Sequence, residues 1–201
     1  MVRIPKRKNR LVVGLTGVFG SGKTSVATLF KKLGAHVIDC DAIVRDIYET
    51  GNPLLKKIGM KFGLRNPNRM KLGALVFSDA RKRHQLEKLI HPYVFQKISE
   101  NLKRVKHGIV VIDMPLLFEV GFERNVEKVV VVASQSQEIR KRLMKKGFSS
   151  GEIVKRLGAQ MPLREKVKRS DFIINNSGGL ENLKKQVQKV LNNLKQSSYM
   201  S

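Results

Sequence analysis

Residues 11–24 read LVVGLTGVFGSGKT, an apolar run that leads directly into a glycine-rich turn. Within this stretch, residues 17–24 match the pattern G-x-x-x-x-G-K-[ST] at every fixed position. The run Leu11–Thr16 has the length and composition of a buried strand, and the apolar residues after the turn recur at helical spacing. Such a strand, turn and helix start bind phosphate together, because backbone N–H groups and the helix dipole point at the anion. A chance match to an ordinary turn is the weaker interpretation, so the stretch predicts a nucleotide-binding P-loop.

The residues of this loop have separate predicted tasks. Lys23 is placed to reach the β- and γ-phosphates of ATP and to stabilise the charge of the transferring group, so we expect it to be catalytic. The hydroxyl of Thr24 is a predicted ligand of Mg²⁺. The predicted ATP-binding residues are Gly17, Gly20, Ser21, Gly22, Lys23, Thr24 and Ser25.

The rest of the chain alternates strand-length apolar runs with helical patterns, which is typical of an α/β fold built on a parallel sheet. Residues 51–107 carry helical patterns alone, and residues 135–169 are helical, charged and interrupted at Gly147, Gly151 and Pro162. We therefore predict a single P-loop kinase domain over residues 1–201 with two helical excursions, of which residues 51–107 are large enough to hold a substrate and the charged residues 135–169 are a candidate lid. The five predicted strands are Leu11–Thr16, His36–Asp39, Gly108–Asp113, Lys128–Ala133 and Asp171–Asn175.

Three aspartates lie at or just after the ends of predicted strands, at the edge of a parallel sheet where ligands bind. Asp39 and Asp41 follow the second strand, and alternation puts their side chains on the same side if both stay extended. We expect Asp41 to be the base that takes the proton of an acceptor hydroxyl, and Asp39 to cap the next helix or support the site. Asp113 ends the third core strand, where it either holds Mg²⁺ through water or is only a turn residue.

The charge is unusual, since 40 Lys and Arg residues against 16 Asp and Glu residues give a net charge of +24. Such a field attracts polyanions, but three interpretations stay open: solvated surface charge, steering of an anionic substrate, and nucleic-acid binding. No recognition signature for RNA or DNA accompanies the charge, so no specific nucleic-acid partner is expected. Among the lysines and arginines of the predicted lid, spacing alone does not identify those that would neutralise the transferring phosphoryl group.

Other features bear on the location of the protein. The single cysteine, Cys40, cannot form an internal disulfide, which favours a reducing, cytoplasmic environment. No run of eighteen or more apolar residues occurs, so no membrane partner is expected. The basic residues 1–10 are interpreted as an arm rather than a targeting signal, because no cleavage site follows them.

The order of several motifs makes the chain similar to the dephospho-CoA kinase family over about residues 11–194. Besides the P-loop, the motifs are Val37-Ile38-Asp39-Cys40-Asp41, Val76-Phe77-Ser78, Leu89-Ile90-His91-Pro92, Pro115-Leu116-Leu117-Phe118-Glu119, Arg142-Leu143, Arg156-Leu157 with Gln160, and residues 171–176, DFIINN. The His-Pro and Pro-Leu-Leu-x-Glu elements are the most selective. The resemblance departs at Val18-Phe19 and at Lys145-Lys146, where an arginine is common, and residues 1–10 have no counterpart in it.

The resemblance implies that the chain transfers the ATP γ-phosphoryl group to the ribose 3′-hydroxyl of dephospho-CoA, the last step of coenzyme A biosynthesis. It implies that Asp41 is the base and binds the acceptor, that Arg142 is the catalytic lid arginine, and that His91 contacts the acceptor. By the same resemblance, a helical acceptor-binding insertion at about residues 46–107 would bind the CoA part, and a helical lid at about residues 135–169 would cover ATP.

Two classes of alternative remain. The first is another small-molecule P-loop kinase, but the chain lacks the Gly-Gly-Gly segment of shikimate kinases and the P-loop proline of adenylate kinases. The second is an ATP-dependent nucleic-acid-binding protein, which the +24 charge favours and the missing recognition motif disfavours.

Overall fold

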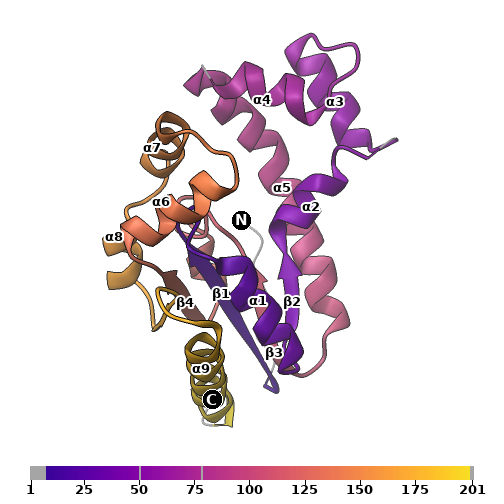
Figure 1. Ribbon diagram of the computed structural model, residues 1–201. Helices are drawn as coiled ribbons and strands as arrows, with labels where there is room; N and C mark the ends of the chain where they lie inside the picture. Colours follow the sequence, from indigo (N-terminus) through magenta and orange to yellow (C-terminus); the bar gives the residue numbers. More distant parts are fainter. Residues whose placement is uncertain (1–7, 50, 78, 200–201) are drawn as a thin grey trace. The chain divides into compact units, whose positions relative to one another are not determined.

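The computed structural model describes residues 8–49, 51–77 and 79–199. Most of the predicted basic arm lies outside these residues, and so does Ser78 of the Val76-Phe77-Ser78 motif. A five-stranded parallel sheet with the strand order β2-β3-β1-β4-β5 forms the centre of the fold (Figure 1). The strands are β1 (Arg10–Gly17), β2 (His36–Asp39), β3 (Gly108–Asp113), β4 (Lys128–Ala133) and β5 (Phe172–Asn175).

The position of β1 in the sheet explains where the P-loop lies. This strand pairs in parallel with β3 on one side and with β4 on the other, so that Leu15 lies opposite Asp113 and Gly17 opposite Val132. The P-loop therefore follows the one strand that has β3 on one side and β4 on the other, which is the point where the strand order of the sheet changes direction. In open α/β sheets, this switch point at the carboxyl ends of the strands is where ligands bind.

Helices account for most of the remaining described residues. They are α1 (Lys23–Lys32), α2 (Cys40–Asp46), α3 (Pro53–Phe62), α4 (Arg69–Phe77), α5 (Ala80–Arg104), α6 (Ser136–Lys145), α7 (Ser150–Gly158), α8 (Leu163–Lys168) and α9 (Leu180–Tyr199), with a short 3-10 helix at Phe122–Asn125. In the described part of the chain, residues 51–107 contain no strand, as predicted, and no helix is long and apolar enough to cross a membrane.

The chain divides into two compact units. The first unit is Asp39–Asn101, whose helices enclose a core of Ile47, Ile58, Leu72 and Leu86. The second unit contains the described residues up to Ile38 and from Leu102 onward, and it holds most of the sheet. The first unit begins earlier than the predicted insertion at 46–107.

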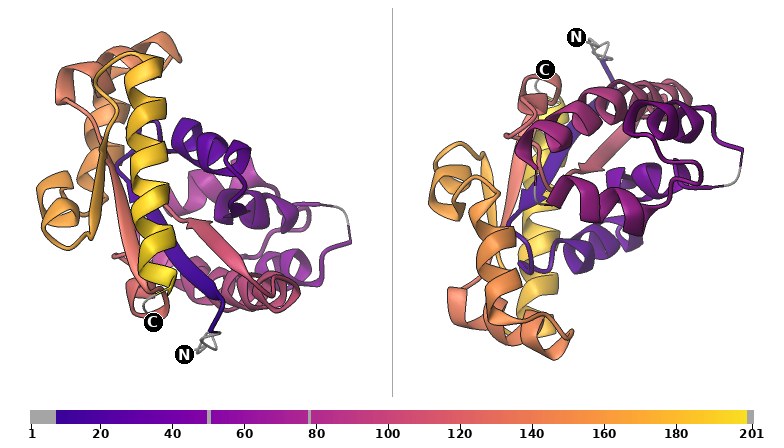
Figure 2. Two further views of the ribbon diagram at one scale, coloured as in Figure 1. Left: turned by 90° about the horizontal axis from the view of Figure 1, so that it is seen from below. Right: turned by 90° about the horizontal axis from the view of Figure 1, so that it is seen from above.

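One face of the sheet is covered by α1 and α9, which Figure 2 shows with α9 in yellow along the strands. Alternate residues of β1, namely Leu11, Val13 and Leu15, point into this layer. The apolar stripe of α9 packs against them, and Leu194 is completely buried. Side chains that alternate along the strands and recur every 3.6 residues along the helix thus bury their apolar faces against each other. This packing holds the start of α1 at the end of β1.

Two expectations about element boundaries were wrong. Arg10 is not part of an exposed arm: it begins β1, is buried, and its Nη1 donates to the carbonyl of Leu102 at 2.6 Å. A guanidinium can be buried there because carbonyls at the end of α5 accept its N–H groups. Gly151 does not interrupt the chain either, since it lies inside α7. That helix begins at a capping box of Ser149 and Glu152, which fixes its start before the glycine.

Candidate phosphoryl-transfer site

The P-loop connects β1 to α1 through glycines that no other residue can replace without movement. Gly22 has φ 87°, and a Cβ there would lie 2.0 Å from Nδ2 of Asn176. A Cβ on Gly17 would lie 2.7 Å from the carbonyl oxygen of Val132. The glycines thus allow both the left-handed turn and the close approach of the loop to β4 and to the chain after β5.

Side chains from distant parts of the second unit hold the loop in place. The carbonyl of Ser21 accepts from Nδ2 of Asn176 at 2.8 Å and from Nη1 of Arg142 at 3.4 Å. Arg142 also donates to the Asn176 carbonyl and, at 3.3 Å, to Oγ of Ser134. The structure therefore places the guanidinium of Arg142 against the P-loop backbone, half-buried, and its predicted catalytic role in the lid stays a prediction.

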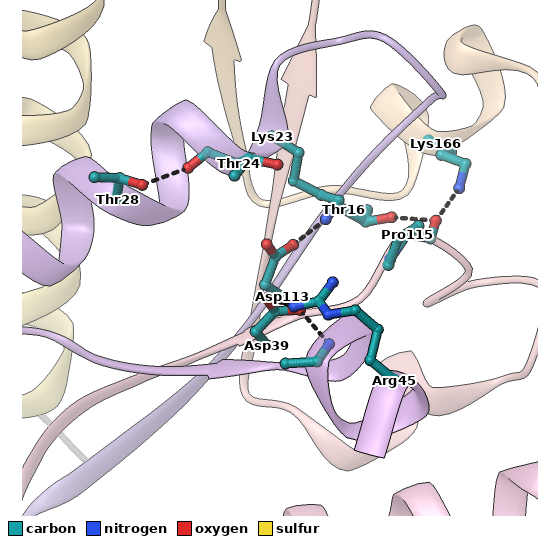
Figure 3. A network of polar contacts seen from close by, with 10 residues as sticks. Thr16, Lys23, Thr24, Thr28, Asp39, Arg45, Asp113, Pro115 and Lys166 are labelled. Atoms are coloured by element: carbon teal, nitrogen blue, oxygen red, sulfur yellow. Dashed lines mark hydrogen bonds and ion pairs between the residues drawn. The ribbon is translucent and has the colours of Figure 1, made fainter. Parts of the chain in front are cut away.

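Lys23 and Asp113 form an ion pair at the carboxyl ends of β1 and β3, and both side chains are mostly buried (Figure 3). Lys23 is the first residue of α1, and Asp113 is the last residue of β3. The hydroxyl of Ser21 is buried and has no hydrogen-bond partner among the described residues. A buried donor without a partner costs free energy, so this end of the loop has hydrogen-bonding capacity left for a ligand.

The residues predicted to bind Mg²⁺ supply oxygen atoms, which this hard cation prefers. Thr24 is exposed on the first turn of α1, and the Asp113 carboxylate lies in the same unit. No group of three or more His, Cys, Asp or Glu side chains that could hold a metal ion occurs in the described ranges. A hydroxyl and a carboxylate nonetheless fit a Mg²⁺ ion that takes its other ligands from phosphates and water.

A second lysine, Lys166 of α8, lies near the phosphate site and was missed by the sequence analysis. Its side chain is completely buried, and Nζ donates to the Pro115 carbonyl at 2.9 Å and lies 2.9 Å from Oε1 of Glu119. The Pro115 carbonyl also accepts from Oγ1 of Thr16 at 2.9 Å (Figure 3). Burial lowers the pKa of Lys166, an effect that Glu119 opposes and the charge of Lys23 adds to.

This network connects α8 and the residues just before it, which belong to the predicted lid, to the turn after β3. Glu119 accepts from the backbone N–H of Met161 at 2.9 Å, and Gln160 accepts from the N–H of Phe19 in the P-loop at 2.8 Å. The resemblance had singled out Glu119 and Gln160, and the structure shows what they contact. Nothing in the spacing of Lys166 distinguished it from the surrounding solvated lysines.

The helices of the predicted lid also pack against the P-loop directly. The ring of Phe19 meets that of Phe148 edge to face at 5.2 Å between centroids. The guanidinium of Arg156 lies 5.2 Å from the Phe19 ring centre and 4.9 Å from that of Phe148. Cation–π contacts of this kind help to hold an arginine in one position. Arg156 therefore contacts the P-loop through the ring of Phe19.

Asp39 and Asp41 do not share a strand, so the condition under which alternation would put their side chains on the same side is not met. Asp39 ends β2 and caps α2, because its Oδ1 accepts from the N–H of Ala42 at 2.9 Å. Oδ2 of Asp39 also lies 3.4 Å from Nη2 of Arg45. Asp41 is exposed in the first turn of α2. The cap role predicted for Asp39 is confirmed, and the role of Asp41 as base stays a prediction.

His91 belongs to the first unit and lies inside α5, directly before Pro92. Its ring is half-buried and stacks on Phe95, with 5.9 Å between ring centroids. Burial lowers the pKa of His91, and His84 adds to this effect while Glu87 opposes it. Its predicted contact with the acceptor stays a prediction.

Comparison with known proteins gives this site a family. The model of a family described as dephospho-CoA kinase matches residues 11–182 of the chain. The chain belongs to the dephospho-CoA kinase family. The match extends from the P-loop strand into α9, so it covers the P-loop, Asp113 and the Lys166 network together.

Individual relatives agree with this family. A dephospho-CoA kinase of Bacillus cereus is 41% identical over 193 residues, covering 91% of this chain and 96% of the relative. Among solved structures, one from Thermus thermophilus is similar with a TM-score of 0.81 and 35% identity, covering 92% of this chain and 98% of that one. A dephospho-CoA kinase from Campylobacter jejuni has a TM-score of 0.69 and 26% identity, covering 94% and 98%.

Proposed function

We propose that the chain transfers the γ-phosphoryl group of ATP to the ribose 3′-hydroxyl of dephospho-CoA. The observation that carries this proposal is the family match over residues 11–182, which includes a complete P-loop. Pairing of Lys23 with Asp113 at the carboxyl ends of β1 and β3 supports it, because a charged lysine there is positioned for phosphate oxygens.

The proposed chemistry is an in-line transfer. The 3′-oxygen of the acceptor forms a bond to the γ-phosphorus, the bond from that phosphorus to the bridging oxygen breaks, and ADP leaves with the bond electrons. Asp41 accepts the proton of the hydroxyl. Lys23 and the N–H groups of the P-loop stabilise the charge on the phosphoryl oxygens, since both are oriented before the reaction begins.

We also propose that Thr24 and Asp113 hold Mg²⁺ together with the phosphates of ATP. When bound, the ion would neutralise charge on the β- and γ-phosphoryl oxygens. The oxygen donors of these two side chains support this assignment. By the family resemblance, residues 46–107 with His91 would bind the CoA part and residues 135–169 with Arg142 would cover ATP. The single cysteine supports a reducing compartment such as the cytoplasm.

The proposal is tested by measuring ADP release from ATP with one candidate acceptor at a time. Dephospho-CoA, shikimate, AMP and RNA represent the family, two rival kinases and the rival nucleic-acid-dependent ATPase. We expect ADP release to rise strongly with dephospho-CoA alone. Stimulation by RNA but not by dephospho-CoA would instead favour a P-loop protein that works on nucleic acid.

A further inference from the structure

A groove with a volume of about 780 Å³ lies between α1 and α9, and phosphoryl transfer does not account for it. The two helices lie side by side in the second unit (Figure 1). Leu29 and Leu33 contribute apolar surface, while amide side chains and the ammonium groups of Lys32, Lys184, Lys185 and Lys189 also line the groove.

The charge of the groove is almost uncompensated. Among the described residues, none that lines the groove is acidic, and α1 contains no Asp or Glu. Lys184 pairs with Glu181 at 2.5 Å, but Lys32, Lys185 and Lys189 form no ion pair within the described part of the chain. Like charges this close repel one another, and an anionic partner would relieve that repulsion.

The groove is separate from the P-loop. Lys32 is the last residue of α1 and Lys23 the first, so about 14 Å of helix lies between them at 1.5 Å per residue. A nucleotide at the P-loop therefore does not neutralise the groove lysines.

We propose that this groove binds the phosphodiester backbone of duplex nucleic acid without sequence preference. A duplex presents one negative charge per about 1.7 Å of its axis, which matches a row of lysines better than a compact anion does. Amide N–H groups beside the lysines can donate to phosphate oxygens. Among the described side chains, none that lines the groove is aromatic, so the described lining provides no stacking on unpaired bases, the usual means of holding single strands.

The test is the salt dependence of binding to a fluorescent DNA duplex and to an RNA duplex of the same length, followed by anisotropy. Each lysine that neutralises a phosphate contributes about 0.9 to the slope of log K against log salt for B-DNA. Replacing Lys32, Lys185 and Lys189 together by Gln should therefore lower the slope for DNA by about 2.7 and weaken binding at low salt.

The matched control replaces Lys57, Lys61 and Lys71 by Gln, which removes the same charge from exposed positions of α3 and α4. We expect this variant to keep the wild-type slope. Equal loss of slope in both variants, absence of duplex binding by the wild-type protein, or equally effective competition by polyglutamate would overturn the proposal. Binding of one duplex type alone would support it and identify the source of the backbone.

Kinase activity provides an independent readout. The groove residues do not belong to the phosphoryl-transfer site, so the variant at Lys32, Lys185 and Lys189 should form CoA at the wild-type rate. That result shows that the variant is folded. A parallel loss of CoA formation and duplex binding would contradict a separate groove, whereas failure of the wild-type protein to form CoA would challenge only the proposed function.

Discussion

The two aspartates around Cys40 differ in what their side chains do, and this difference can be measured. Replacing Asp41 by Asn removes the proposed proton acceptor, so turnover should fall about a hundredfold or more while the KM for ATP stays nearly constant. Asp39→Asn is the matched control: Asn caps helices as well as Asp, so the bond from Ala42 can persist and the effect should be mild. Steady-state kinetics of both variants check this, and the reverse ranking would assign the base to Asp39.

Two glycines with similar backbone conformations provide a second comparison between a site residue and a control residue. Gly22 has φ 87° and Gly34 has φ 92°, but only Gly22 has neighbours that an added Cβ would strike. Gly34→Ala should cost about 1–2 kcal/mol of stability and leave kinetics unchanged, because its only penalty is the left-handed conformation. Gly22→Ala should also displace the loop from Asn176 and lower kcat/KM for ATP about a hundredfold.

Urea unfolding and ATP kinetics on both alanine variants separate the cost of the left-handed backbone from the effect of the steric clash with Asn176. An unchanged kcat/KM in Gly22→Ala would show that the P-loop tolerates displacement, contrary to the close packing seen here.

Among the elements, α8 is held to the turn after β3 by Lys166. Lys166→Met leaves Glu119 without its ammonium partner, so we expect a loss of about 3 kcal/mol in the free energy of unfolding. Adding Glu119→Gln removes the uncompensated charge and keeps an oxygen for the N–H of Met161, so the double variant should recover part of this loss. Urea denaturation of the three proteins gives the comparison. A Lys166→Met variant as stable as the wild type would show that this partly buried pair contributes nothing.

Helix α5 carries a histidine that should make stability sensitive to acid. The pKa of His91 is lowered in the folded protein, so between that value and the ordinary value of 6.5 the unfolded chain binds more protons than the folded one. The contribution of His91 is therefore fully present above about pH 6.5 and is lost as the pH falls through the folded pKa.

We expect His91→Gln to lose less stability than the wild type when the pH is lowered from about 7.5 to about 5.5. His107→Gln is the control, because His107 is exposed in the other unit. The midpoint of urea unfolding measures the change. An identical acid dependence in His91→Gln and the wild type would contradict the pKa shift.

The sequence predicted the sheet well because buried parallel strands are short, apolar and flanked by glycine or polar residues. The bounds of β2, β3 and β4 agree with the prediction, and β5 begins one residue later, at Phe172, although the backbone N–H of Asp171 already donates to the Val129 carbonyl. The interruption at Gly151 was wrong since a glycine near a capping box need not end or divide a helix.

The site was harder to predict than the sheet. The P-loop and Asp113 were predicted as site residues because a local pattern or a strand end marks them. Lys166 is separated from Glu119 by 47 positions and adjoins other charged residues, so periodicity assigns it to solvent. Burial of such a side chain depends on tertiary partners, which one sequence does not reveal.

At the scale of the whole molecule, family membership and net charge point to different activities. The order of the motifs predicted the dephospho-CoA kinase family, and the family match over residues 11–182 confirms it. The charge of +24 does not follow from that membership. Lys23 and the groove lie in different parts of the second unit, so variants at Lys23 and in the groove should affect the two activities independently.

The most direct measurement identifies the product formed from ATP and dephospho-CoA by mass spectrometry and phosphorus NMR. We predict equal amounts of ADP and of CoA phosphorylated at the ribose 3′-hydroxyl. A folded Lys23→Ala variant should form CoA about a hundredfold more slowly or worse, since Lys23 stabilises charge in the transition state. ADP formed without CoA, a phosphoryl group at another position, or near-normal turnover by Lys23→Ala would contradict the assignment of this P-loop to dephospho-CoA phosphorylation.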